Sequence, residues 1–150
     1  MENTANSFEN IIQGTWWLLS REDYTKDGQR RVDHVLGSDP VAILVYAKNY
    51  FAAQFMKKDR SADSIAHSTK AGKNNTAATG GYDAYFGTYK IDGKTNQVAH
   101  TLIGSINPDN IGITVHRNLC VQEDRLIIEL DTTTTQGESV TRTLTWEKIS

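Results

Sequence analysis

The chain has 150 residues and a formal net charge of -2 at pH 7, and 38% of its residues are hydrophobic. This length allows one domain with a substantial core, and no shift in composition marks an internal boundary, so residues 1–150 are expected to form a single domain. Charges of both signs are interspersed, so the chain lacks the basic stripe that nucleic acids and anionic membranes attract. Neither is an expected partner.

The start of the chain and its cysteine content bear on location. Residues 1–12 show neither a basic n-region nor an apolar h-region, and no apolar run approaches the roughly 18 residues of a membrane span. Cys120 is the single cysteine, so it cannot form an internal disulfide. Together these features predict a cytoplasmic protein.

The first strand-like run covers residues 14–24, where Trp16, Leu18 and Ser20 are predicted to face one way. Alternation with a period of two residues is typical of a strand with one buried face. The apolar pair at 11–12 precedes this run and favours a short lead-in helix or cap.

Three further runs follow, at 30–37, 41–47 and 50–58, and each is set off by turn residues. The run 41–47 is apolar on both faces, which predicts a well-covered strand. Tyr46 at its end and Phe51 in the next run are predicted to line the mouth of one cavity.

The segment 59–81 differs from the rest, because it is polar and nearly free of large apolar side chains. Such a segment cannot bury enough area to belong to a core, so it is predicted to be a long loop. Loops of this length often cover a site, which makes a lid one interpretation. A surface loop without a role is the other.

Three runs in the second half carry the most unusual polar residues: 82–92, 97–105 and 111–121. In the last of them apolar and polar residues alternate, and Arg117 falls on the apolar face. His100 lies on the apolar face of 97–105 in the same way. Polar groups that point into an apolar interior indicate a pocket.

Two more runs, 125–131 and 139–149, complete about nine short strands joined mainly by tight turns. Consecutive strands with short connections predict an antiparallel meander, and closing it removes exposed edges. The expected fold is therefore all-β. It is an antiparallel up-and-down β-barrel of about eight to ten strands, with an interior cavity and a long polar loop.

Short motifs are spread along the chain in a recognisable order. They are Gly14-Thr15-Trp16, Pro40-x-Ala42-x-Leu44-x-Tyr46 followed by Phe51, Lys58-Asp59-Arg60, Tyr85-x-Gly87-x-Tyr89, Val98-x-His100, Arg117, and Arg142-x-Leu144-x-Trp146-Glu147. Their order and spacing resemble the bacterial and fungal lipocalin-like domain family over nearly the whole chain, from Gly14 to Lys148. Two positions depart from the family pattern: Ala42 stands where glycine is usual, and the segment at Arg60 lacks the proline that commonly follows.

This resemblance implies a calycin-type barrel with an interior cavity. It implies little about chemistry, because most such domains have no assigned activity and some related barrels act as cofactor-free cyclases or isomerases in natural-product pathways. It also implies structural roles for Trp16 and Arg142. In such barrels the tryptophan of the first strand plugs one end, and an arginine of the last strand lies across its ring.

His100 and Arg117 are the candidate catalytic residues, and each has two interpretations. His100 is either a core histidine with satisfied hydrogen bonds or a general acid or base, since its unperturbed pKa lies near neutral pH. Arg117 cannot shed its proton, so inside a barrel it must meet a protein carboxylate, a ligand anion, a carbonyl or trapped water. The open alternatives are a structural ion pair and a ligand carbonyl or enolate oxygen held by the guanidinium. The carboxylates considered as its partners are Asp33, Asp83, Glu129 and Asp131.

Two functions therefore stay open. In the first, the barrel binds a small hydrophobic, oxygen-bearing molecule in its cavity. In the second, it is a cofactor-independent isomerase or cyclase that acts on a ketone-bearing natural-product intermediate, with His100 as acid or base and Arg117 as oxyanion stabiliser. The aromatic residues predicted to contact the ligand are Tyr46, Phe51, Phe55, Tyr85 and Tyr89.

No cofactor is expected, because the sequence has no glycine-rich nucleotide loop. No metal is expected either, because the four histidines show no ligand spacing. The expected partner is a small hydrophobic molecule, and the sequence is compatible with a monomer or a homodimer.

Overall fold

The structure is a computed structural model that describes residues 4–60, 80–134 and 136–150. This part of the chain holds the helix α1 (Thr4–Ile12), the short 3-10 helix η1 (Pro108–Asn110) and nine strands. The strands are β1 (Gly14–Tyr24), β2 (Arg30–Arg31), β3 (Val41–Tyr46), β4 (Tyr50–Met56), β5 (Tyr82–Asp92), β6 (Gln97–Ser105), β7 (Thr114–Gln122), β8 (Arg125–Thr133) and β9 (Ser139–Lys148).

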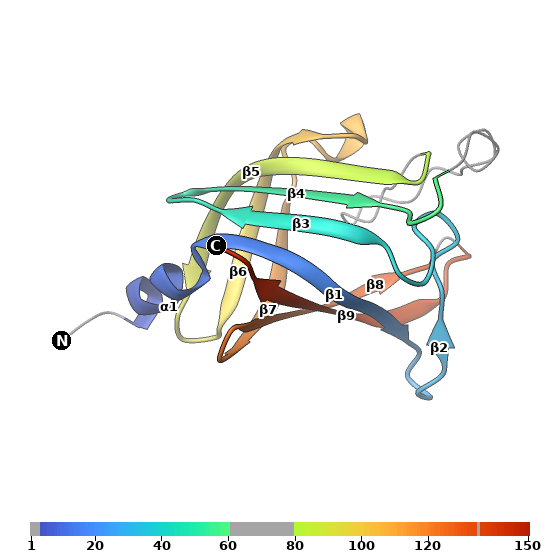
Figure 1. The fold of residues 1–150 in the computed structure, drawn as a ribbon, viewed down its shortest axis with the longest axis horizontal. Helices are drawn as coiled ribbons and strands as arrows, with labels where there is room; N and C mark the ends of the chain where they lie inside the picture. Colours follow the sequence, from blue (N-terminus) through green and yellow to red (C-terminus); the bar gives the residue numbers. More distant parts are fainter. Residues whose placement is uncertain (1–3, 61–79, 135) are drawn as a thin grey trace.

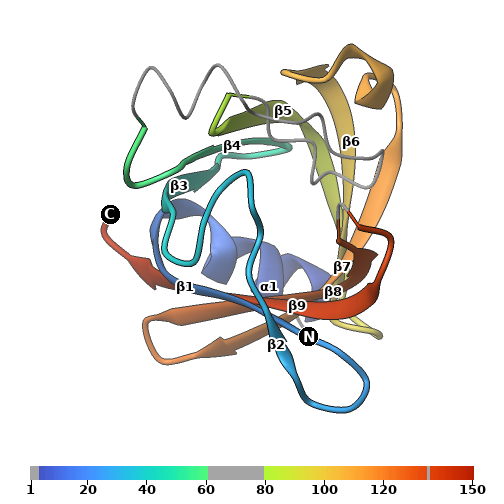
Figure 2. The same cartoon turned by 90° about the vertical axis from the view of Figure 1, so that its right-hand side faces the viewer.

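The described strands form one antiparallel sheet that closes on itself (Figures 1 and 2). From β3 onward each strand pairs with the next along the chain, and β1 pairs with both β3 and β9, so eight strands complete a barrel. The two-residue β2 extends the sheet beside the end of β1. The predicted all-β, up-and-down barrel is confirmed, and closure pairs the strand edges that an open sheet would expose.

A bulge in β1 changes which side chains point inward. The register with β9 shifts between Leu18 and Ser20. Before the shift Trp16 and Leu18 are buried, and after it Arg21 and Asp23 are buried while Ser20 is only half-buried. The prediction that Ser20 shares the face of Trp16 is therefore wrong, because one extra residue reverses the alternation of a strand.

Two predicted runs form shorter strands than expected. In 30–37 only the first two residues belong to the sheet, as β2. In 111–121 the strand starts at Thr114, because η1 and a left-handed Gly112 (φ 90°) turn the chain just before it. Ile111 consequently lies at the surface, 51% exposed, and not on the apolar face of β7. The runs 82–92 and 97–105 coincide with β5 and β6.

One end of the barrel is closed by α1, as expected of the lead-in segment (Figure 1). Ile12 is fully buried, and its carbonyl accepts a hydrogen bond from Trp16 Nε1 at 2.8 Å. The predicted contact between Arg142 and Trp16 is wrong. The Lys148 amine lies 5.8 Å from the centre of a Trp16 ring, whereas Arg142 binds Asp23 further along β1. Register explains this, since Trp16 pairs with Lys148 and Arg142 with Asp23.

The predicted loop 59–81 falls mostly on residues 61–79, which lie outside the described residues. Its role as a lid stays a prediction. In the part of the chain that the structure covers, no helix has the length and apolar character to span a membrane.

Trp16→Ala is expected to lower the free energy of unfolding by about 3 to 5 kcal/mol, because it removes a fully buried indole and leaves a cavity. Trp17→Ala is the matched control, since Trp17 is the next residue of β1 and is 40% exposed. Trp17→Ala should lower the free energy of unfolding by less than about 1 kcal/mol, because this side chain lies partly at the surface. Urea denaturation of both variants measures the difference, and equal losses would contradict the assigned facing.

Candidate functional site

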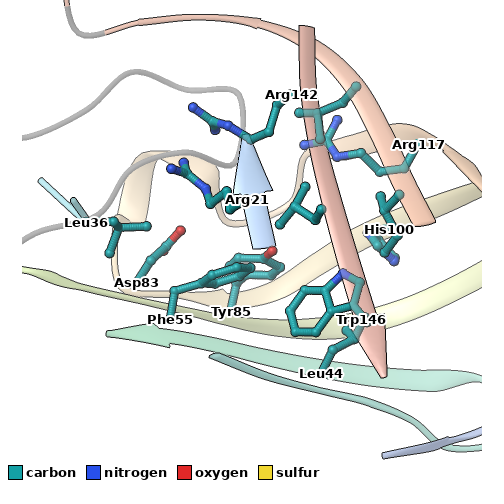
Figure 3. Close-up of a pocket in the computed structure, with 13 residues that line it drawn as sticks. Arg21, Leu36, Leu44, Phe55, Asp83, Tyr85, His100, Arg117, Arg142 and Trp146 are labelled. Carbon is teal, nitrogen blue, oxygen red and sulfur yellow. The ribbon is translucent and has the colours of Figure 1, made fainter. Parts of the chain in front are cut away.

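The interior holds a cavity to which all eight strands of the barrel contribute side chains. Three guanidinium groups lie on one side of it, and three aromatic rings lie on the other (Figure 3). The six residues are Arg21, Arg117, Arg142, Phe55, Tyr85 and Trp146. His100 and Asp83 also line the cavity, and leucine and isoleucine side chains complete the wall. The predicted interior cavity is therefore present, and it is strongly polar on one side.

The cavity is small, with a volume of about 40 Å³, and it is partly open to solvent. One water needs roughly 10–15 Å³ on the same scale, whereas sites that enclose a drug-sized ligand have roughly 300–1,000 Å³. The space thus fits a few waters or the polar end of a ligand. A whole hydrophobic molecule does not fit without movement of the lining side chains.

Arg142 is held by a buried ion pair between the first and last strands. Its Nε and Nη2 donate to the two carboxylate oxygens of Asp23, both at 2.8 Å, and both side chains are at most 5% exposed. Asp23 points inward because of the bulge in β1, and Arg142 lies directly opposite on β9. Such bidentate pairs fix orientation as well as charge, so one edge of the guanidinium is set by Asp23.

Arg21 is held by Asp33 of the β2–β3 connection, with Nη2 donating to a carboxylate oxygen at 3.1 Å. The other oxygen of Asp33 accepts the backbone N–H groups of Val35 and Leu36 at 2.7 and 3.2 Å. Burial alone would raise the pKa of Asp33, but Arg21 and these N–H groups lower it below its usual value. The pair anchors the connection over the cavity, where Leu36 forms part of the wall.

Asp83 is the carboxylate that lines the cavity itself. It lies on β5 opposite Phe55 and is 4% exposed. Burial raises the pKa of Asp83 to about 7, although Arg21 and the backbone N–H of Ala84 oppose the shift. Both protonation states are therefore populated near neutral pH.

His100 packs among aromatic rings. Its Nε2 lies 2.6 Å from the Tyr46 hydroxyl, and its ring stacks on Phe51 with centres 4.1 Å apart. Burial, with the charge of Arg117 as a second cause, lowers the pKa of His100 to about 3. The pKa of His100 therefore lies well below its unperturbed value, because an imidazolium in this packed layer would lose its hydration.

Arg117 lies on β7 opposite Val98, is 6% exposed, and donates Nη1 to the His116 carbonyl at 3.1 Å. Burial lowers the pKa of this guanidinium, while Tyr85 and Tyr46 favour its charged form. Three of the carboxylates considered as its partners are placed elsewhere. Asp33 binds Arg21, and Glu129 and Asp131 lie on the exposed face of β8.

The predicted aromatic contacts divide into two groups. Phe55 and Tyr85 line the cavity. Tyr46, Phe51 and Tyr89 lie instead in a packed layer around His100; the rings of Tyr46 and Tyr89 are 4.8 Å apart, and the Tyr89 hydroxyl donates to the Ala47 carbonyl at 2.7 Å. This layer separates the cavity from the end of the barrel that α1 closes.

Sequence reasoning missed Arg21 and Asp83 as cavity residues, and it placed Arg142 in a structural role only. The sequence pattern could have predicted the inward direction of Asp83, since this residue shares the alternation of Tyr85 in the run 82–92. Arg21 carried no such signal, because its inward direction depends on the bulge in β1.

The comparisons with known proteins support the family suggested by the motifs. The family model described as a lipocalin-like domain matches residues 13–149. No curated protein matches the chain. Among the described residues, no group of three or more His, Cys, Asp or Glu side chains is arranged to hold a metal ion.

Asp83→Asn is expected to remove a pH-dependent loss of stability. In the unfolded chain Asp83 ionises near its usual pKa of 3.8, but in the folded protein it does so at about 7. The folded protein therefore binds the extra proton between these values, and its stability falls as the pH rises from about 4 to about 7. Asparagine cannot ionise, so the variant does not lose this stability. Its free energy of unfolding relative to that of wild type should therefore rise by on the order of 2 to 4 kcal/mol between about pH 4 and about pH 7.

Urea denaturation from pH 4 to pH 8 measures this difference. Asp39→Asn is the control, because Asp39 forms an exposed pair with Lys58 at 3.3 Å and such pairs contribute little. If the free energy of unfolding depended on pH in the same way in wild type and in Asp83→Asn, the raised pKa of Asp83 in the folded protein would be contradicted.

The nitrogen chemical shifts of the His100 imidazole are expected to stay those of a neutral ring from pH 8 down to about pH 4, because burial holds the pKa at about 3. The same residue in urea-unfolded protein should titrate near its ordinary pKa of roughly 6.5. A folded-state midpoint between pH 6 and pH 7 would restore His100 as an acid or base at neutral pH.

Proposed function

Because the chain belongs to the lipocalin-like domain family, we propose that this barrel binds a small hydrophobic, oxygen-bearing molecule in the cavity beside Arg117. The observation that carries this proposal is the presence of guanidinium groups in the wall of an interior cavity. Arginine stays charged in proteins, and burying its charge costs free energy unless hydrogen bonds compensate. A wall of this kind favours an electron-rich oxygen in the space before it.

The size of the cavity decides how such a ligand is oriented. A volume of about 40 Å³ accepts the oxygen-bearing end, and the open side of the cavity leaves the apolar remainder a path outward. Phe55, Leu144 and the ring of Tyr85 supply apolar contacts. The oxygen lies next to the arginines, and the hydrocarbon lies against the aromatic wall.

The enzymatic alternative places the same oxygen at Arg117 and adds proton transfer by His100. The geometry gives it less support. A histidine with a pKa of about 3 is neutral at pH 7, and its Nε2 is already engaged by the Tyr46 hydroxyl. The isomerase or cyclase activity stays a prediction, and binding is preferred because it requires only the cavity and its arginines.

Compact ring compounds fit a small cavity and test the proposal directly. Cyclohexanecarboxylate, cyclohexanol and cyclohexanone each carry an oxygen, and cyclohexane is the matched control without one. NMR titration should show saturable shifts of Tyr85 and Trp146 signals with oxygenated compounds and none with cyclohexane. If no oxygenated compound shifts these signals, the barrel does not bind ligands of this class.

Arg117→Leu should weaken binding of the best oxygenated compound by roughly 10- to 150-fold, the range for a hydrogen bond to a charged group. Arg30→Leu is the control, because Arg30 lies on the exposed β2. Isothermal titration calorimetry measures both affinities. A fall of several kcal/mol in the free energy of unfolding, with affinity unchanged, would instead assign Arg117 to a structural ion pair.

A further inference from the structure

The two arginines at the charged end of the cavity have donors left over after their ion pairs. Asp23 takes Nε and Nη2 of Arg142, so Nη1 has no part in that pair. Asp33 takes only Nη2 of Arg21. A guanidinium carries more N–H groups than one carboxylate oxygen pair accepts, and its planar fork suits a carboxylate. Both side chains line the cavity, so both can serve a second anion there.

A further donor lies in the opposite wall. Trp146 is 1% exposed, and its Nε1 finds no hydrogen-bond acceptor among the described residues. Figure 3 shows this nitrogen on the edge of the indole that faces the inside of the pocket. An indole N–H can only donate, and buried donors without a partner are rare in native proteins. An acceptor in the cavity would satisfy it.

Asp83 limits what that acceptor can be. It shares the small cavity with any bound ligand, and two ionised carboxylates within a few ångströms of each other repel strongly. A bound carboxylate is therefore compatible with Asp83 only when one of the two carries a proton. The charged groups that act on Asp83 from the surrounding elements are Arg21 on β1, Asp33 in the β2–β3 connection and Arg142 on β9. Opposite it on β4 lies Phe55, which carries no charge.

We propose that the oxygen of the ligand belongs to a carboxylate, which lies beside Arg117 and between Arg21, Arg142 and Trp146, and that Asp83 is protonated in the complex. Above pH 7, where free Asp83 is mainly ionised, binding then takes up about one proton from the solvent, and the ligand remains the anion because the arginines face it. This inference rests on the proposed binding function and specifies its ligand class. The pKa of Asp83, which burial already raises to about 7, makes it the group that accepts the proton most readily.

Matched acids and alcohols test the ligand class. The pairs are cyclohexanecarboxylate with cyclohexylmethanol and octanoate with octanol, each measured by calorimetry at pH 6. The acids are expected to bind at least tenfold more tightly than the alcohols. Equal affinity of acid and alcohol would overturn the carboxylate assignment and leave the binding function standing. Absence of binding by every compound would reject the binding function, and this inference with it.

The proton is tested by pH and by buffer. Affinity of wild type for cyclohexanecarboxylate should fall about tenfold per pH unit above pH 7, because Asp83 must then be reprotonated. At pH 8, binding enthalpies in buffers of different ionisation enthalpy should report uptake of about one proton. Asp83→Asn should abolish both effects and bind the acid more tightly than wild type at pH 8, whereas Asp39→Asn should behave as wild type. Proton uptake that persists in Asp83→Asn would overturn the role of Asp83.

The indole signals locate the anion within the protein. The Trp146 Nε1–H resonance should move downfield on binding of cyclohexanecarboxylate, because it gains an acceptor. The Trp16 Nε1–H resonance should not move, since it already donates to Ile12 at 2.8 Å. A shift of Trp16 alone, or of neither, would place the acid outside this cavity and overturn the assignment.

Discussion

The bidentate pair between Asp23 and Arg142 links the two strands at which the barrel closes. Both residues are buried, so each charge depends on the other. A buried guanidinium without a carboxylate would leave a charge uncompensated in a medium of low polarity. The pair exists only because the bulge in β1 points Asp23 inward, and the same bulge brings Arg21 to the cavity. Closure of the sheet and polarity of the site thus have one structural origin.

The barrel interior is divided along its axis. Toward α1 it is filled by aromatic rings, with Trp16 fully buried and His100 stacked on Phe51. Toward β2 it is charged, with two ion pairs and Asp83 beside the small cavity. Close packing stabilises the first region and leaves little room in it for a ligand. Incomplete packing and buried charge make the second region suited to a ligand.

His100 and Asp83 show what burial does to each sign of charge. Desolvation lowers the pKa of His100 to about 3 and raises that of Asp83 to about 7, so both are pushed toward their neutral forms. Only Asp83 is brought close to physiological pH by this shift. Proton chemistry in this barrel is therefore expected at the aspartate, even though histidine is the residue type whose unperturbed pKa is near neutral.

Local pattern determined much of this protein. Period-two alternation and turn residues located β5 and β6, and short connections between consecutive strands led to a closed antiparallel barrel. Alternation also put His100 and Arg117 inside, because a side chain on an apolar face of a strand must follow that face into the core.

Tertiary structure alone decided the rest. A bulge is an adjustment between neighbouring strands, so the inward direction of Arg21 and Asp23 could not be read from β1 by itself. The partner of Arg142 depends on the register between β1 and β9, which joins residues 119 positions apart in the chain. The pKa values of His100 and Asp83 follow from burial by strands distant in sequence. Residue type and alternation supply the groups that can act, but their charge and their partners arise only when the sheet closes around them.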